Sequence, residues 1–198
     1  MSYPQLSILI PAAGVSRRLG QPKQLQRYRK KTLIQNAVET AHSITPREII
    51  VVTGANAEAV KDAIQTVPVC WIHNPNWSAG IGGSIATGAA GISPESTGVM
   101  ILLCDQWRLR TSDLQDLAEK WYSDPERIVC AEADGQLMPP VVFPVGCFSA
   151  LQALKGDSGA RSILKDHPEL LTAVPSKNAA YDVDTPTQLS QLQITDLS

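Results

Sequence analysis

The sequence predicts an α/β fold: a single-domain, three-layer α/β/α arrangement around a mostly parallel, twisted sheet. Short apolar, β-branched runs alternate with amphipathic helical stripes along the whole chain, and such alternation is typical of parallel sheets covered by helices. Loops rich in glycine and polar residues follow several of these runs. The length of 198 residues suits one domain with a sizeable core. We therefore expect residues 1–198 to form one domain.

The alternation gives an ordered set of elements. The expected strands are Ile8–Ile10, Glu48–Thr53, Val69–His73, Gly98–Cys104, Arg127–Ala131, Pro140–Phe143 and Leu171–Val174. The expected helices are Thr32–Ser43 with Thr32 as N-cap, 56–65 with Asn56 as N-cap, one starting at Ser84, Ser112–Tyr122, Gly146–Leu154, Ala160–Asp166, and one starting at Thr187. The run Gly98–Cys104 is the most apolar, which places it at the centre of the sheet.

Composition excludes several classes of protein. A net charge of −2 argues against broad nucleic-acid binding, which needs a basic face. The longest apolar run, Val99–Cys104, is far too short to span a membrane, and Met1–Gln5 lacks the basic start of a secretory leader. The cysteines are widely spaced, which favours buried free thiols over disulfides; they are Cys70, Cys104, Cys130 and Cys147. We expect a cytoplasmic protein with neither nucleic acid nor membrane as partner.

Three loops are predicted to meet at one edge of the sheet. They follow Ile10, Ile72 and Cys104, each the end of an expected strand. In open α/β sheets the ligand crevice lies beyond the carboxyl ends of the strands. The sequence therefore predicts a binding site formed by these loops.

The loop after Ile10 reads P-A-A-G-V-S-R-R-L-G-Q-P-K. It is neither a P-loop nor a dinucleotide fingerprint, but its small residues allow backbone N–H groups to face an anion. We expect Arg18 and Lys23 to contact a triphosphate, against the alternative of a surface turn. The other basic residues nearby are interpreted as solvated surface; they are Arg17, Arg27, Arg29, Lys30 and Lys31.

Carboxylates near strand ends suggest a metal site. Asp105 directly follows the most apolar strand, where a hard cation such as Mg²⁺ would justify a carboxylate; the alternative is an N-cap or a salt bridge. In the segment D-V-D, capping of the last helix by itself explains Asp184 but leaves Asp182 as a possible second ligand. Asp157 is interpreted as turn chemistry.

The glycine-rich loop after Ile72 carries two further candidates. Trp77 could stack on a base or a pterin-like ring, or pack beneath its own loop. Ser84 could bond a ligand through its hydroxyl or cap the helix that it begins.

Five motifs in order resemble the MobA-like nucleotidyltransferase family, and most closely its molybdenum cofactor cytidylyltransferase group. P-A-A-G-V-S-R-R-L-G-Q-P-K-Q-L is similar to A-A-G-x-S-x-R-M-G-x-P-K-Q-L, and N-P-N-W-S-A-G-I-G-G-S to the family's tryptophan loop. L-L-C-D-Q, G-D-S-G-A-R and D-V-D-T-P complete the series. Together they span almost the whole chain.

The resemblance implies a Rossmann-like nucleotidyltransferase fold and an activity. CMP would pass from CTP to the phosphate of a molybdopterin-type cofactor, with Mg²⁺ as cofactor and pyrophosphate as product. A molybdoenzyme of the hydroxylase type would be a further partner. The implied catalytic residues are Arg18, Lys23 and Asp105, and the implied metal ligands are Asp105 and Asp182. The implied nucleotide-binding residues are Ala12, Ala13, Gly14, Val15, Ser16, Arg18, Lys23, Gly80 and Ser84. The implied acceptor-binding residues are Trp77, Gln106, Trp107 and Met138.

Three departures from the family pattern keep alternatives open. Trp107 replaces the proline after D-Q, Met138 replaces a glycine, and Lys30 replaces a turn glycine. The first two border the expected acceptor side. The alternatives are another small acceptor, such as a sugar or isoprenoid phosphate, GTP as donor, and a non-catalytic carrier of the cofactor or nucleotide.

Overall fold

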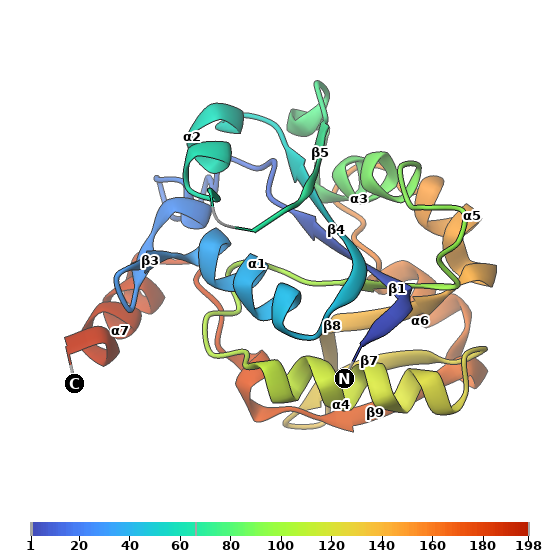
Figure 1. The fold of residues 1–198 in the computed structure, drawn as a ribbon. Coiled ribbons are helices and arrows are strands. Elements are labelled where there is room, and N and C mark those ends of the chain that lie inside the picture. Colours follow the sequence, from blue (N-terminus) through green and yellow to red (C-terminus); the bar gives the residue numbers. More distant parts are fainter. Residues whose placement is uncertain (1, 66, 198) are drawn as a thin grey trace.

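The computed structural model describes residues 2–65 and 67–197, and in this part of the chain seven strands form one sheet (Figure 1). Met1, Thr66 and Ser198, the first and last of which end the expected domain, lie outside the described residues. In spatial order the strands are β5 (Cys70–His73), β4 (Pro46–Thr53), β1 (Tyr3–Pro11), β6 (Gly98–Ile101), β8 (Gln136–Pro144), β7 (Ile128–Ala133) and β9 (Leu171–Pro175).

The sheet is mostly parallel, as the alternation of strands and helices predicted. β1 pairs in parallel with β4 and β6, β4 with β5, and β7 with β9. Only β8 among these strands runs antiparallel to its neighbours, β6 and β7. The apolar strand β6 occupies the centre of the sheet, which confirms its expected position.

Helices cover both faces of the sheet. The α-helices are α1 (Leu33–Ser43), α2 (Ala57–Asp62), α3 (Ile81–Ala89), α4 (Thr111–Ser123), α5 (Phe148–Gln152), α6 (Arg161–Asp166) and α7 (Pro186–Leu197). Buried residues of α1 and α4 pack on one face, and buried residues of α3, α5 and α6 pack on the other. The three-layer prediction is therefore confirmed.

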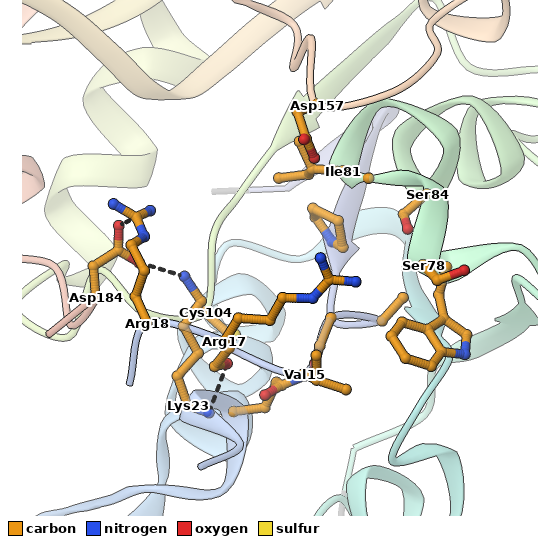
Figure 2. A pocket seen from close by; sticks show the side chains of 17 residues that line it. Val15, Arg17, Arg18, Lys23, Ser78, Ile81, Ser84, Cys104, Asp157 and Asp184 are labelled. Carbon is orange, nitrogen blue, oxygen red and sulfur yellow. Dashed lines mark hydrogen bonds and ion pairs between the residues drawn. The ribbon is translucent and has the colours of Figure 1, made fainter. Parts of the chain in front are cut away.

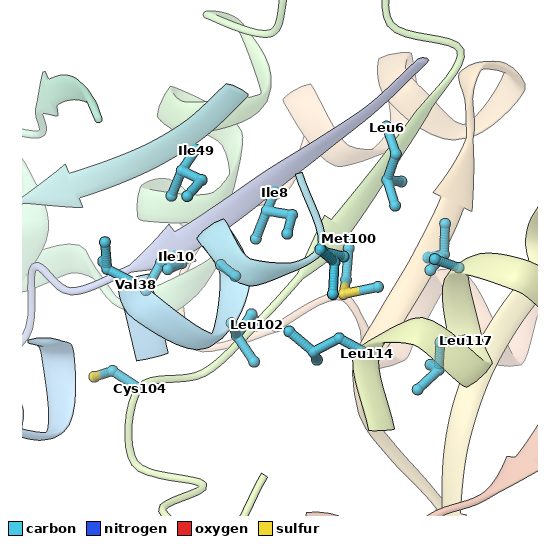
Figure 3. Close-up of a cluster of buried hydrophobic side chains, with 14 of the residues drawn as sticks. Leu6, Ile8, Ile10, Val38, Ile49, Met100, Leu102, Cys104, Leu114 and Leu117 are labelled. Atoms are coloured by element: carbon cyan, nitrogen blue, oxygen red, sulfur yellow. The ribbon is translucent and has the colours of Figure 1, made fainter. Parts of the chain in front are cut away.

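The alternation along β1 shows how the sequence builds the two layers. Ile8 and Ile10 point toward α1 and α4 (Figure 3), whereas Leu9 belongs to the cluster on the α3 side. Successive side chains of a strand point to opposite faces. A continuous apolar run is therefore needed wherever both faces are covered.

Helix boundaries depart from the sequence prediction mainly at three places. Helix α5 is two residues shorter at each end than the expected Gly146–Leu154, and Val145–Cys147 forms a 3₁₀ turn before it. α3 begins at Ile81 rather than Ser84, because Gly80, with φ of 117°, ends the 3₁₀ turn Trp77–Ala79 and starts the helix directly. α2 is shorter than expected, and the side chain of Asn56 makes no capping bond. The predicted cap of α1 is confirmed: Thr32 accepts a hydrogen bond from the Gln35 amide at 3.2 Å.

Two strands of two residues each, β2 (Arg27–Tyr28) and β3 (Lys31–Thr32), form a hairpin that was not expected. Its turn residues Arg29 and Lys30 have φ of 53° and 66°. Hairpin turns of this kind favour glycine or asparagine. The sign of a turn in the sequence was the turn glycine of the family pattern, which Lys30 replaces in this chain.

A third cluster of buried residues joins this hairpin to the C-terminal segment. α7 lies beside β2 (Figure 1). The members come from the first loop, the hairpin, α1, the segment after β6 and the C-terminal segment; they are Leu19, Tyr28, Leu33, Trp107, Val183, Leu189 and Leu192.

The four cysteines are free thiols. Cys104, Cys130 and Cys147 are buried, whereas Cys70 is exposed and corrects the expectation that strand cysteines are buried. Among the helices of the described residues, none has the length and apolar character needed to cross a membrane.

Candidate active site

A cavity of about 580 Å³ opens at the carboxyl end of β1 (Figure 2). Its lining comes from the first loop, the tryptophan loop, the start of α3 and two later segments of the chain. The lining residues are Pro11, Ala13, Gly14, Val15, Ser16, Arg17, Arg18, Lys23, Gln24, Trp77, Ser78, Gly80, Ile81, Ser84, Cys104, Asp157 and Asp184. Most of the residues expected to bind the nucleotide therefore meet in one place.

A buried side chain that the sequence did not single out, Gln24, fixes the backbone of the first loop. The Gln24 amide donates to the backbone oxygens of Ala12 at 2.9 Å and Gly14 at 2.7 Å. Ser16, with φ of 56°, accepts a hydrogen bond from the Lys23 amide at 3.0 Å. Ala12 lies behind the cavity rather than in its lining. The only sequence signal for Gln24 was its place in P-K-Q-L.

Lys23 lies at the centre of an ion-pair network. Its ammonium bonds both Asp105 and, at 2.9 Å, Asp184, while Arg18 bonds the other oxygen of Asp184 at 2.8 Å. Burial alone would lower the pKa of Lys23, but Asp105 and Asp184 outweigh it and raise that pKa above its usual value. Burial alone would raise the pKa of Asp184, but Lys23 and Arg18 outweigh it and lower that pKa.

In the segment 182–184 the structure corrects the capping role expected of Asp184 and places its two aspartates differently. Helix α7 is capped by Thr185, whose hydroxyl accepts from the Gln188 amide at 3.3 Å, so the carboxylate of Asp184 is available for Lys23. Asp182 instead accepts a hydrogen bond from the Gln188 side chain at 2.7 Å and does not line the cavity. Burial, followed by repulsion from Asp105 and Asp184, raises the pKa of Asp182.

The carboxylates fit a hard divalent cation, which prefers oxygen ligands. Asp105 is buried, and its Oδ1 has no hydrogen-bond partner in the structure. Among the described residues no group of three or more His, Cys, Asp or Glu side chains could hold an ion. Mg²⁺ typically takes one or two carboxylates and completes its shell with water and phosphate oxygens. The site therefore suits a cation that arrives together with a phosphate ligand.

The opposite wall of the cavity forms where the start of α3 meets the loop 155–159. The Gly82 amide donates to the Gly156 oxygen at 2.9 Å. A Cβ at Gly80 would lie 2.4 Å from the Gly156 backbone, so only glycine fits there. This contact carries Asp157 into the cavity (Figure 2). The interpretation of Asp157 as simple turn chemistry was therefore incomplete.

Ser84 and Arg17 also line the cavity. Ser84 is buried and accepts a hydrogen bond from the Asn74 side chain at 3.1 Å. Arg17, interpreted as solvated surface, lines the cavity and extends toward the side where Ser78 and Ser84 lie (Figure 2). The sequence did not predict this position of Arg17, because a pair of adjacent arginines is as common on a protein surface as in a binding site.

The four residues expected to bind the acceptor do not converge. Trp77 lines the cavity. Gln106 is buried and its amide is committed to the backbone oxygens of Pro139 and Ala179 at 2.6 and 2.7 Å. Trp107 packs into the third cluster, and Met138 packs against the core on the α4 side. Packing and internal hydrogen bonds therefore account for three of these four side chains.

Comparisons with known proteins agree with this geometry. Residues 8–171 match the family model described as the MobA-like NTP transferase domain. The chain is 31% identical over 200 residues to a protein named nicotine blue oxidoreductase from Paenarthrobacter nicotinovorans, covering 96% of this chain and 97% of that protein. It is 28% identical to purine catabolism protein PucB from Bacillus subtilis (strain 168), with 98% of both chains covered.

Solved structures share the fold. The crystal structure of a homologue of Mycobacterium tuberculosis Rv0371c from Mycobacterium sp. strain JC1 has a TM-score of 0.84 at 22% identity, covering 98% of both chains. Rv0371c from M. tuberculosis H37Rv in complex with manganese has a TM-score of 0.75 at 22% identity, covering 96% of this chain and 98% of that one. With a family match across most of its length, the chain belongs to the MobA-like NTP transferase family and is a nucleotidyltransferase.

Proposed function

We propose that the protein transfers CMP from CTP to the phosphate of a molybdopterin-type cofactor and releases pyrophosphate in a Mg²⁺-dependent reaction. The observation that carries this proposal is the cavity itself. It brings a loop of small residues, Lys23, Arg18 and the carboxylate of Asp184 together at the end of β1, and the Lys23 ion pair links this cavity to Asp105. These are the groups that a triphosphate and its cation need in one place.

The loop and its two cations would hold the triphosphate. The ion pairs keep Lys23 and Arg18 directed to the edge of the cavity before any nucleotide binds. Because the donors are positioned in advance, little reorganisation is needed when charge develops at the α-phosphorus. The acceptor phosphate would attack that phosphorus in line, and pyrophosphate would leave without a covalent enzyme intermediate.

Asp105 and Asp184 would hold the cation, with Asp182 as the alternative second carboxylate. A bound Mg²⁺ supplies neutralisation of the charge on the phosphate oxygens. The unpartnered Oδ1 of buried Asp105 supports this assignment, as does the manganese complex of a structural neighbour. The choice of Asp184 over Asp182 rests on the cavity lining, which includes Asp184 but not Asp182.

The choice of donor and acceptor rests on the sequence motifs. A-A-G followed by S-x-R and P-K-Q-L resembles the cytidylyl rather than the guanylyl members of the family. The acceptor would enter from the wall formed by Trp77 and Asp157. The product would then pass to a molybdoenzyme of the hydroxylase type.

Pyrophosphate release tests the proposal. CTP, GTP, UTP and ATP are each supplied with Mg²⁺, with and without the molybdopterin-type cofactor, and sugar and isoprenoid phosphates are tested as acceptors. We expect release only with CTP and the cofactor. Release with another acceptor or with GTP moves the assignment to that substrate, and no release under any condition favours the carrier. Oxidation of NADH or NADPH is followed in parallel, because one relative is named an oxidoreductase.

A matched pair of variants tests the metal ligand. We expect Asp105→Asn to lower Mg²⁺-dependent turnover by at least about 100-fold, because it removes a charge from the cation site. Asp166→Asn, at the exposed end of α6, removes the same charge elsewhere and should have no effect. Full activity of Asp105→Asn in a folded protein would show that the cation site is misplaced.

A further inference from the structure

A second pocket, of about 310 Å³, shares no lining residue with the cavity within the described part of the chain. It lies between the hairpin, α1, the loop before α4 and the segment that follows β9. Its lining residues are Tyr28, Arg29, Asn36, Thr40, Trp107, Arg108, Leu109, Arg110 and Asn178. The proposed transfer reaction makes no use of this pocket.

We propose that this pocket binds a small molecule that carries a phosphate group, and that Arg108 is its main anion ligand. The lining brings together the positive charges of Arg29, Arg108 and Arg110 and contains no aspartate or glutamate. Such a concentration of cations is unusual in a chain whose net charge is −2.

The guanidinium of Arg108 is fixed by aromatic rings rather than by a carboxylate. It lies 3.8 Å from the ring centroid of Tyr181 and 4.7 Å from that of Trp107. Among the described residues, the ion pairs do not include Arg108. A cation–π contact does not use the N–H donors of a guanidinium, so these donors can still bind an anion. Arg108 is therefore a positioned donor group without an acidic partner.

Of the two rings that contact Arg108, that of Trp107 is buried, whereas Tyr181 is 42% exposed. Trp107 packs edge-on against Tyr28, with ring centroids 4.8 Å apart. Both residues are only 8% exposed and belong to the third cluster. Trp107, which the sequence assigned to acceptor binding, thus forms a rigid wall of the second pocket.

A carboxylate beside the pocket, that of Asp113, makes no ion pair with Arg108. Asp113 lies beside the pocket at the first turn of α4, where it accepts hydrogen bonds from the Arg110 amide at 2.8 Å, the Asn178 side chain at 2.9 Å and the Ser176 hydroxyl at 3.0 Å. Its bonds go to backbone and neutral groups, so they orient Asn178 and cap the helix. The guanidinium of Arg108 remains available to a ligand.

The size and the apolar walls define the ligand class. Leu109 and the rings of Tyr28 and Trp107 line the pocket beside the arginines. The volume of the pocket is at the small end of the range for organic ligands. Bidentate arginine contacts favour phosphate. We therefore expect a phosphate monoester with a compact organic group, not a nucleoside triphosphate. This inference does not rest on the proposed transfer reaction.

Two-dimensional ¹H–¹⁵N NMR at constant ionic strength tests the proposal, with inorganic phosphate and phenyl phosphate as probes. We expect both probes to shift the indole N–H of Trp107 and amides of residues 106–110. Equal affinity would assign binding to the phosphate alone, and tighter binding of phenyl phosphate would assign part of it to the apolar walls; both results support the pocket. Shifts confined to residues 13–18, or none, would overturn it.

Variants locate the anion contact. We expect Arg108→Gln to weaken phenyl phosphate binding about tenfold or more, and Arg110→Gln, at an exposed position, to weaken it less. Lys165→Gln, which removes an exposed charge from α6, should leave binding unchanged. Well-dispersed spectra confirm that each variant is folded. If Arg108→Gln and Arg110→Gln both bind as tightly as Lys165→Gln, the pocket is not an anion site.

Discussion

At the scale of single residues, Lys23 connects three distant parts of the chain. Its carboxylate partners lie 82 and 161 positions further along the sequence. The ammonium holds together Asp105 and Asp184, which would otherwise repel each other and Asp182. A lysine of this kind is both a structural counter-ion and, in our proposal, a triphosphate ligand.

Substitution of Lys23 should therefore affect activity and stability in different ways. We expect Lys23→Met to lower single-turnover pyrophosphate release by about 10²–10³-fold. It should also lower the melting temperature in EDTA, with recovery on addition of Mg²⁺, because a cation can replace the missing ammonium between the carboxylates. Lys165→Met serves as the surface control. Unchanged turnover in Lys23→Met would remove this residue from the catalytic site.

At the scale of elements, the contact between α3 and the loop 155–159 shapes one wall of the cavity. A Cβ at Gly82 would lie 2.7 Å from the Ser158 oxygen and 2.8 Å from the Lys155 oxygen, whereas one at Gly83 would meet nothing within 4 Å. Two adjacent glycines of the same helix thus have different reasons to be there. One permits packing, and the other merely reduces helix propensity.

These two glycines form a matched pair. We expect Gly82→Ala to lower the free energy of unfolding by about 1–3 kcal/mol, because the backbone of the loop must move, and to weaken nucleotide binding. Gly83→Ala should raise stability by about 0.5–1 kcal/mol. Urea unfolding and calorimetric titration with CTP measure the two effects. Equal stability changes would show that the loop yields without cost.

The hairpin of β2 and β3 offers a second test at this scale. Lys30 has φ of 66°, a conformation that costs side-chain-bearing residues about 1–2 kcal/mol. After the greater backbone entropy of glycine is counted, Lys30→Gly should raise the free energy of unfolding by about 0.5 kcal/mol. Lys31→Gly, in the extended strand β3, should instead lower it by about 1 kcal/mol. A loss in both variants would mean that the turn is not strained.

At the scale of the whole molecule, the charges of the cavity tie folding to pH. Asp184 has a lowered pKa in the folded state, so its contribution to stability is present above about pH 4 and is lost as the pH falls through the folded value. The raised pKa of Lys23 contributes stability that persists below the ordinary lysine value and is lost only at higher pH. Asp182, whose pKa is raised, acts in the opposite sense to Asp184.

Two isosteric substitutions separate these carboxylates. Without metal, we expect Asp184→Asn to lower the free energy of unfolding at neutral pH, with the loss shrinking in acid. Asp182→Asn should raise it at neutral pH, because repulsion from Asp105 and Asp184 disappears while the Gln188 bond to an oxygen is kept. That gain should vanish as the pH falls below the raised pKa of Asp182. Urea titrations across pH measure both, and effects of equal sign would contradict the assignment.

The part of the candidate site that the loop after Ile10 forms could be predicted from sequence, because its residues lie close together in the chain. Local small residues after a strand end and nearby cations indicate an anion loop whatever the rest of the fold does. Gln24 and Arg17 were not predicted. The sequence does not show whether a glutamine is buried or whether an arginine lines a cavity. The hairpin escaped because its strands have only two residues each.

The sequence by itself determined the three-layer fold, the central place of β6 and the family of the chain, because periodicity and ordered motifs are local properties. Only the tertiary structure decided that Asp184 rather than Asp182 bonds Lys23, that the Gln106 amide bonds two backbone oxygens while Met138 packs against the core, and that Arg108 lies over two aromatic rings beside a second pocket. Each of these outcomes depends on a contact between segments that lie far apart in the sequence. Neighbouring residues such as Asp182 and Asp184 differ in direction, not in chemistry, and direction is fixed only when the chain has folded.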